Sequence, residues 1–306
     1  MIAILTGFTT IGIIIAVGYG ALRCGVVGTG ARDMLTRLAF FIAMPALLVN
    51  VVAEADLGDL LRLPLFIQVI VIAVAAGIFL LANRLWLRLK APEATIGTYA
   101  ASYINAANIG IPVAVYVLGD PAATVPLMLL QSLLLGPLAI MLLDLLTAGR
   151  VSWRFVLTQP LRNPIILAAI IGVVLSLTGW RLPYMVDAPL RLVGGAAIPM
   201  QLLAFGMSLS GARLLGPQSA RRAAAVAALV KVVVMPVLAF VVARFVFRLD
   251  DVLVFSAVVL AGLPTAQNVY NYAGRFRRGE ILARDTILLT TVMSPVVFII
   301  AAALLR

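Results

Sequence analysis

Apolar positions in this chain gather in long, nearly continuous stretches that short polar segments separate. A stretch of about 20 apolar residues is long enough to cross a hydrocarbon core of about 30 Å as a helix. Ten such stretches can be counted, so the pattern predicts an all-α integral membrane protein with ten transmembrane helices. The predicted spans cover residues 5–22, 35–52, 63–83, 94–118, 123–146, 164–178, 190–209, 223–247, 252–273 and 287–305.

Two of these spans are interrupted near the middle by a proline set among amide side chains. One interruption covers residues 102–112 and ends at Pro112; the other covers residues 263–271 and contains Pro264. A simple kink is the alternative explanation for a membrane proline. The clustered amides favour a cavity instead, because polar groups at mid-depth cost free energy unless they find partners.

The chain also shows signs of an internal duplication. We predict two five-helix repeats, residues 1–146 and 164–306, joined by a short cytoplasmic linker at 147–163. Because each repeat has an odd number of spans, the second must be inverted in the membrane, as in many secondary transporters, with the broken fourth and ninth helices crossing. Prolines recur roughly 150 to 160 residues apart in corresponding spans: Pro45 with Pro199, Pro112 with Pro264, and Pro137 with Pro295.

Composition supports a lipid bilayer as the environment of the chain. Hydrophobic residues make up 63% and charged residues 11%, whereas soluble domains carry about 25% charged residues. The formal net charge of +11 comes from single, scattered basic residues, so no nucleic acid partner is predicted. The first span has no basic leader and is expected to be a true crossing.

The basic residues also predict an orientation, because an excess of Lys and Arg marks cytoplasmic loops. One set of loops holds 16 basic residues: Arg23, Arg32, Arg37, Arg84, Arg88, Lys90, Arg150, Arg154, Arg162, Arg213, Arg221, Arg222, Arg275, Arg277, Arg278 and Arg284. The other set and the C-terminus hold six: Arg62, Arg181, Arg191, Arg244, Arg248 and Arg306. We expect a multi-pass protein of the cell (inner) membrane with both termini outside the cytoplasm.

Helices that break inside the membrane predict where a ligand would bind. The half-helices expose N–H groups at one end and carbonyls at the other, with partial charges of about +0.5 and −0.5. The N-terminal ends suit a carboxylate, and the amides are expected on the cytoplasmic flank of the breaks. The alternative is that the amides only join the two broken helices. The predicted substrate-binding residues are Tyr103, Asn105, Asn108, Gly110, Pro112, Pro264, Thr265, Gln267, Asn268 and Asn271.

One cation, Lys231, is predicted near the midplane of the eighth span. A lysine at that depth costs about 2.5 to 3.5 kcal/mol and needs an internal partner. It can neutralise half-helix carbonyl ends or add positive potential for an anionic substrate, and we favour the first role.

Several other kinds of chemistry are missing from the sequence. The chain has no histidine and one cysteine, Cys24, so metal, cofactor and triad chemistry are not expected. No acid pair occurs at mid-depth, and we therefore predict that the protein is not an enzyme. A passive organic-anion channel or uniport pore and a non-transporting membrane sensor remain as alternatives to a secondary transporter.

Short motifs at the two interruptions and in the eighth span carry a family resemblance. They are Asn105 with Gly110-Ile111-Pro112, Tyr116 and Gly119; residues 263–268, Leu-Pro-Thr-Ala-Gln-Asn, with Ala273; and Lys231 before Pro236. In these motifs the chain resembles the auxin efflux carrier family, which includes plant PIN carriers and bacterial carriers of small organic acids. The resemblance covers essentially the whole chain.

The resemblance implies a fold similar to that of bile-acid and sodium/proton carriers. In that plan spans 1, 2, 6 and 7 form a scaffold that supports a homodimer, while spans 3–5 and 8–10 form a transport domain that moves as an elevator. It implies that Asn105 contacts the substrate carboxylate and that Pro112 and Pro264 are the crossover prolines. Thr265 and Ala266 stand where plant carriers have a Gln-Gly pair, and the implied substrate is a small carboxylate, auxin-like or a dicarboxylate.

Overall fold

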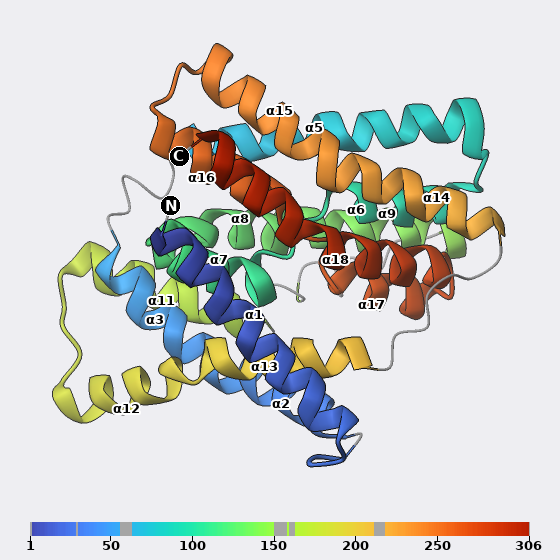
Figure 1. Ribbon diagram of the computed structural model, residues 1–306. Helices are drawn as coiled ribbons and strands as arrows, with labels where there is room; N and C mark the ends of the chain where they lie inside the picture. The colour runs from blue at the N-terminus through green and yellow to red at the C-terminus, as the bar shows by residue number, and fades with distance from the viewer. Residues whose placement is uncertain are drawn as a thin grey trace.

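The computed structural model is helical in every part of the chain that it describes, apart from loops and one isolated bridge between extended segments (Figure 1). The described residues are 2–28, 30–55, 63–149, 158, 163–210 and 218–305. The predicted linker at 147–163 therefore lies largely outside them.

The α-helices are named by the labels of Figure 1, and π-helical turns join several of them into longer continuous helices. The α-helices are α1 Ile2–Arg23, α2 Ala31–Leu38, α3 Met44–Glu54, α5 Leu63–Ala82, α6 Ala91–Ser102, α7 Ile111–Val113, α8 Val125–Leu130, α9 Gly136–Ala148, α11 Pro164–Thr178, α12 Tyr184–Gly195, α13 Ala197–Ser210, α14 Gln218–Leu229, α15 Met235–Val241, α16 Asp251–Gly262, α17 Asn268–Phe276 and α18 Glu280–Leu305. The π-helical turns are Ala39–Ala43, Asn83–Leu87, Ala106–Gly110, Ala114–Leu118, Gln131–Leu135, Val230–Val234 and Val242–Val246.

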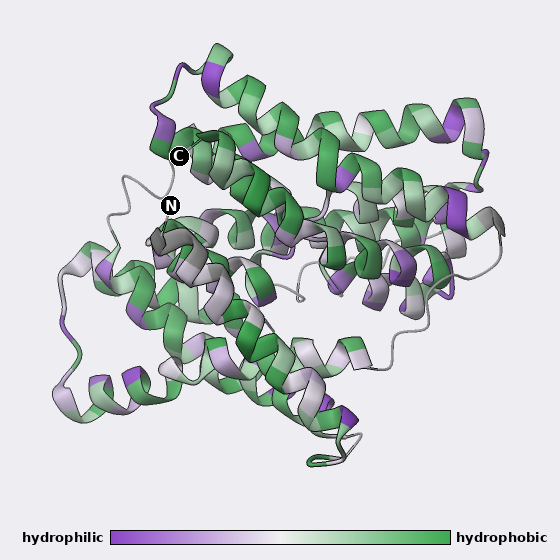
Figure 2. Cartoon of the chain, viewed as in Figure 1, coloured by the Kyte–Doolittle hydropathy of each residue, from purple (hydrophilic) through white to green (hydrophobic). Residues whose placement is uncertain are grey.

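Among the described residues, six continuous helices are long and apolar enough to cross a membrane: Ala31–Glu54, Leu65–Leu87, Pro121–Thr147, Tyr184–Ser210, Ala220–Val246 and Glu280–Leu305. Shorter apolar helices, Thr9–Arg23, Ala106–Leu118, Pro164–Thr178 and Asp251–Gly262, lie where the sequence predicts the other four spans. Hydrophobic residues cover most of the helical ribbon (Figure 2). The described residues are thus helical, and their length and composition indicate a multi-pass membrane protein.

Packing divides the helices into two groups. In the first, α1 packs against α13, α3 against α11 and α12, and α2 against α13. In the second, α5 packs against α6, α14 and α16 against α18, and α15 against α16. In the first group α1 and α13 approach closely, because Gly18 lies against the backbone of Leu203 and Gly206 against that of Ile15.

The first predicted interruption is a true break, but it begins before Pro112. Helix α6 ends at Ser102, Tyr103 is extended, and a new helix starts after Asn105, whose φ of −78° and ψ of 62° are not helical. Pro112 lies inside the continuous helix Ala106–Leu118, shortly after the π-helical turn Ala106–Gly110, and the break comes before that helix. Asn108 therefore precedes Pro112 in the chain but lies in the helix that follows the break.

The second break is caused by its proline. Helix α16 ends at Gly262, and Leu263 takes a ψ of 145°, because the ring of Pro264 disfavours the α conformation of the preceding residue. Helix α17 then begins at Asn268.

The two extended segments cross and pair as a very short antiparallel ladder. Ile104 and Thr265 form the bridge. The Asn105 N–H donates to the Pro264 carbonyl at 2.8 Å, and the Ala266 N–H donates to the Tyr103 carbonyl at 3.2 Å. Each break thus supplies the backbone partners that the other has lost.

Two side chains bond the carbonyl ends of the helices that lead into the crossing. The Thr265 hydroxyl donates to the Ala100 carbonyl of α6 at 2.6 Å, and the Lys231 ammonium donates to the Ala261 carbonyl of α16 at 2.7 Å. Both residues are fully buried. A cation at a helix C-terminus also opposes the negative end of the helix dipole.

The Thr265 bond gives a test of the crossing. Thr265→Val keeps the shape of the side chain but leaves a buried carbonyl without this donor, which costs about 1–3 kcal/mol. We expect this variant to have a lower thermal unfolding midpoint than the parent protein, measured in detergent by tryptophan fluorescence. Thr147→Val is the matched control, because the Thr147 hydroxyl bonds the Leu143 carbonyl of its own helix at the protein surface. Equal midpoints for the two variants would show that the crossing does not depend on this bond.

Candidate functional site

A cavity of about 470 Å³ lies beside the crossing and is lined by residues of both breaks. Its size is within the range of small-molecule sites. Residues from α2, the π-helical turn Ala106–Gly110, α8, α9, α11 and α17 also contribute to its wall. The cavity thus lies between α2 and α11 of the first packing group and α17, which packs against α6 and α18 of the second.

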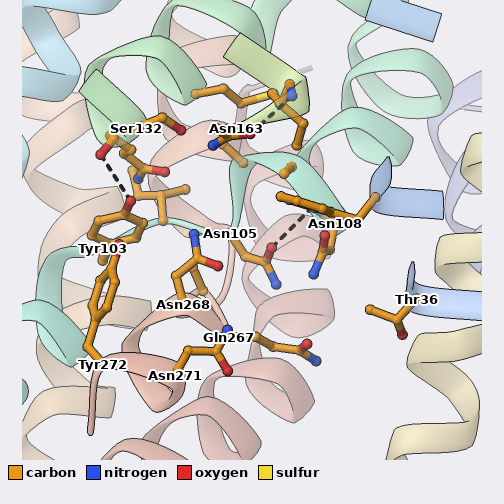
Figure 3. Close-up of a pocket in the computed structure, with 18 of the residues that line it drawn as sticks. Thr36, Tyr103, Asn105, Asn108, Ser132, Asn163, Gln267, Asn268, Asn271 and Tyr272 are labelled. Carbon is orange, nitrogen blue, oxygen red and sulfur yellow. Dashed lines mark hydrogen bonds between the residues drawn. The ribbon is translucent and has the colours of Figure 1, made fainter. Parts of the chain in front are cut away.

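Five amide side chains form one wall of the cavity: Asn105, Asn108, Gln267, Asn268 and Asn271. Asn105 and Asn108 come from the first break and the other three from the second, and Figure 3 shows both sets facing the same space. Asn105 is 4% exposed, whereas Asn268 and Asn271 are exposed to solvent. The cavity therefore reaches from the crossing to the protein surface.

The helices that leave the crossing begin at this wall. The Asn105 Oδ1 accepts a hydrogen bond from the Asn108 N–H at 3.2 Å and caps the first of them. At the start of α17 the N-cap residue Gln267 makes no side-chain cap bond. The N–H groups of Val269, Tyr270 and Asn271 donate to the carbonyls of Ala266 and Gln267, so α17 contributes mainly the positive end of its helix dipole beside the cavity.

Tyrosines form a second wall, and a π-helical turn positions them. The turn Gln131–Leu135 interrupts the helix formed by α8 and α9, and such turns disturb the regular backbone ladder. The Tyr103 hydroxyl donates to the Gln131 carbonyl at 3.1 Å, and the Tyr99 hydroxyl donates to the Leu135 carbonyl at 2.9 Å. Tyr272 meets Tyr103 edge to face, with ring centroids 6.4 Å apart (Figure 3).

Gln131 has an unused hydrogen-bond donor. This residue lines the cavity and is 4% exposed, and its Nε2 has no partner among the described residues. A buried donor left unpaired costs free energy, so this amide suits an acceptor oxygen of a ligand. The sequence analysis did not identify it, because the π-helical turn that places it gives no sequence signal.

Arginines were also missed at this site. Arg37 of α2 and Arg275 of α17 line the cavity, although the charge pattern assigns both only to loops. A very small adjoining cavity contains Arg32 and the buried Gln201. In the described part of the chain, no acidic side chain lines either cavity.

The predicted site residues thus fall into two sets. Tyr103, Asn105, Asn108, Gln267, Asn268 and Asn271 line the cavity. Gly110, Pro112, Pro264, Thr265 and Lys231 do not; all five are buried in the crossing or behind it. A Cβ on Gly110 would lie 3.2 Å from a Leu263 methyl carbon, so its small size serves packing.

The arrangement is suited to holding an anion. It offers amide donors, helix N-termini and guanidinium groups in one cavity. Within the described ranges, no three His, Cys, Asp or Glu side chains gather in a way that could hold a metal ion.

Comparison with known proteins agrees with this chemistry. The family model described as "Membrane transport protein" matches residues 3–150 and 147–301. The chain belongs to this family of membrane transport proteins. The resemblance to auxin efflux carriers is thereby confirmed, and the protein is a membrane transporter rather than an enzyme.

One relative of this membrane transport protein comes from Rhizobium meliloti (strain 1021) and bears the name "Putative malonate transporter". The two chains are 27% identical over 297 residues, which cover 92% of this chain and 89% of the relative.

The unpaired Gln131 donor gives a test of the site without any ligand. Gln131→Leu removes a buried polar atom that has no partner, so the thermal midpoint should stay equal or rise. In Gln131→Glu the side chain has nearly the same size but buries a carboxyl group. This variant should have a lower midpoint, and its free energy of unfolding should fall by about 1–3 kcal/mol. A clear loss of stability in the leucine variant would show that the amide is a structural element of the packing.

Proposed function

We propose that this membrane transport protein carries a small organic anion across the membrane by elevator-type alternating access. The observation that carries the proposal is that the two sides of the crossing differ in electrostatic character. The carbonyl ends of α6 and α16 are bonded by Thr265 and Lys231, while amide side chains and helix N-termini face the cavity. A carboxylate suits that cavity, and Asn105 is the residue we place at its centre.

The substrate class follows from the same wall. A carboxylate can accept hydrogen bonds from the amide groups of Asn105, Gln131 and Asn268. The positive end of α17 also attracts its negative charge. The name of the relative contains malonate, which supports a carboxylate as the substrate, either an auxin-like carboxylate or a dicarboxylate.

The packing groups suggest how the site moves. We assign α1, α2–α3, α11 and α12–α13 to a scaffold, and α5, α6–α7, α8–α9, α14–α15, α16–α17 and α18 to a transport domain. This assignment corresponds to ten transmembrane helices in two inverted repeats. The crossing helix also contacts α1 through Ala114–Leu118, so the transport domain would slide along α1. A homodimer through scaffold helices is part of the same proposal.

The orientation proposed from the basic loops predicts the side of the membrane to which the cavity opens. Arg37 and Arg275 belong to the more basic set of loops, so the cavity would open to the cytoplasm, with both termini outside, in the cell membrane. On the far side of the amides, Ile104 and Thr265 are fully buried, which favours a carrier over a passive pore. An inside-negative potential of 100 mV would favour export of an anion by about 2.3 kcal/mol per charge.

Asn105→Asp tests the proposal most sharply. The aspartate keeps an oxygen that can cap the Asn108 N–H, but it replaces an amide donor with a negative charge. We expect malonate flux in proteoliposomes to fall at least about tenfold, equivalent to 1.4 kcal/mol or more.

Asn83→Asp is the matched control, because the Asn83 Oδ1 also accepts a backbone N–H, from Leu89 at 2.9 Å, and lies outside the cavity. Flux of malonate and other small carboxylates at the parent rate through the Asn105 variant would remove this residue from the site.

A further inference from the structure

The junction between α5 and α6 carries a group of exposed cations. The helix of α5 continues through the π-helical turn Asn83–Leu87, and α6 begins at Ala91. Arg84, Arg88 and Lys90 lie at this junction, and all three are exposed. In the described part of the chain, no carboxylate forms an ion pair with any of them. We call these three residues the basic loop.

Hydrogen bonds hold the basic loop in one compact turn. The Arg88 N–H donates to the Asn83 carbonyl at 2.8 Å, and the Leu89 N–H donates to the Asn83 Oδ1 at 2.9 Å. Arg88 takes a φ of 50°, in the left-handed region that residues other than glycine rarely adopt. The chain turns back at this point, because α6 packs against α5. The three cations therefore extend from a single ordered turn.

The basic loop lies where a membrane-crossing helix ends. Helix Leu65–Leu87 is long and apolar enough to cross a membrane, and Arg84 and Trp86 are in its last turn. Trp86 is 81% exposed, and a tryptophan at such a helix end is typical of the boundary between acyl chains and headgroups. Figure 2 shows hydrophilic residues at this end of α5 and in the loop that follows. The cations are thus placed at the level of lipid headgroups.

A second loop has a similar backbone but a different charge pattern. It follows the π-helical turn Val242–Val246, contains Arg248 with a φ of 51°, and leads into α16. Here the Asp251 carboxylate pairs with Arg244 at 2.8 Å, and the Asp250 carboxylate caps the start of α16. The two loops lie at opposite ends of the structure (Figure 1). In this second loop, acids thus compensate an arginine and a helix end.

The basic loop has no such acids at the equivalent places. Lys90 takes the N-cap position of α6, and no side chain caps the start of this helix. Glu93, the acid in its first turn, is paired with Arg278 at 3.4 Å. The three cations therefore lie beside the positive end of α6, a combination that suits phosphate oxygens.

We propose that the basic loop binds the phosphate headgroup of an anionic phospholipid. Its acyl chains would lie along the apolar surface of α5, where Leu85 and Trp86 are exposed next to the cations. This continuity between a cationic and an apolar surface favours a lipid over a soluble phosphate. An excess of basic residues on one side of the membrane explains where the charges lie, but it does not explain the difference in acids between two similar loops.

The test uses Trp86 as a fluorescent reporter in the full-length protein. Trp153→Phe and Trp180→Phe remove the other two tryptophans. The protein is reconstituted in phosphatidylcholine vesicles with a small fraction of nitroxide-labelled lipid, either phosphatidylglycerol or phosphatidylcholine, labelled at the same position near the headgroup. The ratio of the two quenching efficiencies reports which lipid is enriched beside Trp86. Phosphatidylglycerol should quench at least about threefold more strongly, because Lys and Arg near the surface attract anionic lipids.

Neutralising the basic loop should abolish this preference. In the triple variant Arg84→Gln, Arg88→Gln and Lys90→Gln, the quenching ratio should fall to near one, and in Lys90→Gln alone it should fall in part. Quenching by labelled phosphatidylcholine at the parent level shows that Trp86 keeps its place in each variant.

The double variant Arg244→Gln and Arg248→Gln is the matched control, because it neutralises the arginines of the second loop, and it should keep the parent ratio. A ratio near one in the parent protein would overturn the lipid site. The parent ratio in both the triple variant and Lys90→Gln would overturn it as well.

Discussion

The structure depends on the mutual pairing of two chain segments that cannot remain helical inside the hydrocarbon layer. Lipid offers no hydrogen bonds, so each N–H and carbonyl released by a broken helix must find a partner within the protein. Here the partners come from the other break: the Asn105 N–H donates to Pro264, and the Ala266 N–H donates to Tyr103. Neither segment would be stable at that depth alone, and both must therefore meet at one point.

This pairing gives the site its polarity. Where the chain enters the crossing, helix C-termini converge, and Lys231 and Thr265 bond their carbonyls. Where the chain leaves it, helices begin, and their positive ends are accompanied by amides rather than acids. The amide hydrogen-bond donors and arginines of the cavity are unfavourable for a cation, whereas they are complementary to a carboxylate. The buried lysine does not line the cavity, and in the proposed function it supports anion binding only from behind, through the Ala261 carbonyl.

Much of the fold could be predicted because its causes are local. Apolar stretches place the helices, and Pro264 breaks the second crossing helix by restricting Leu263. The first break falls within the predicted interruption at residues 102–112, but its exact position before Pro112 could not be predicted, because it follows from pairing with a segment far along the chain rather than from its own sequence.

Part of the site could be predicted for the same reason. Asn105 and Asn268 each belong to a local cluster of amides that is visible in the sequence, whereas the bond between Lys231 and Ala261 joins separate helices. Arg37 could not be predicted as a cavity residue either, because the sequence does not distinguish an arginine in a loop from one that lines a cavity. Gln131 becomes a site residue only through a π-helical turn.

The central claim is that the amide side of the crossing, and not the lysine side, holds the anion. A cryo-electron microscopy map of the full-length protein in nanodiscs saturated with malonate tests this directly. The account predicts density for a carboxylate at Asn105 and the first turn of α17, with the Lys231 ammonium still bonded to Ala261. Density for the anion at Lys231, or a cavity wall without ligand density at saturating malonate, would contradict it.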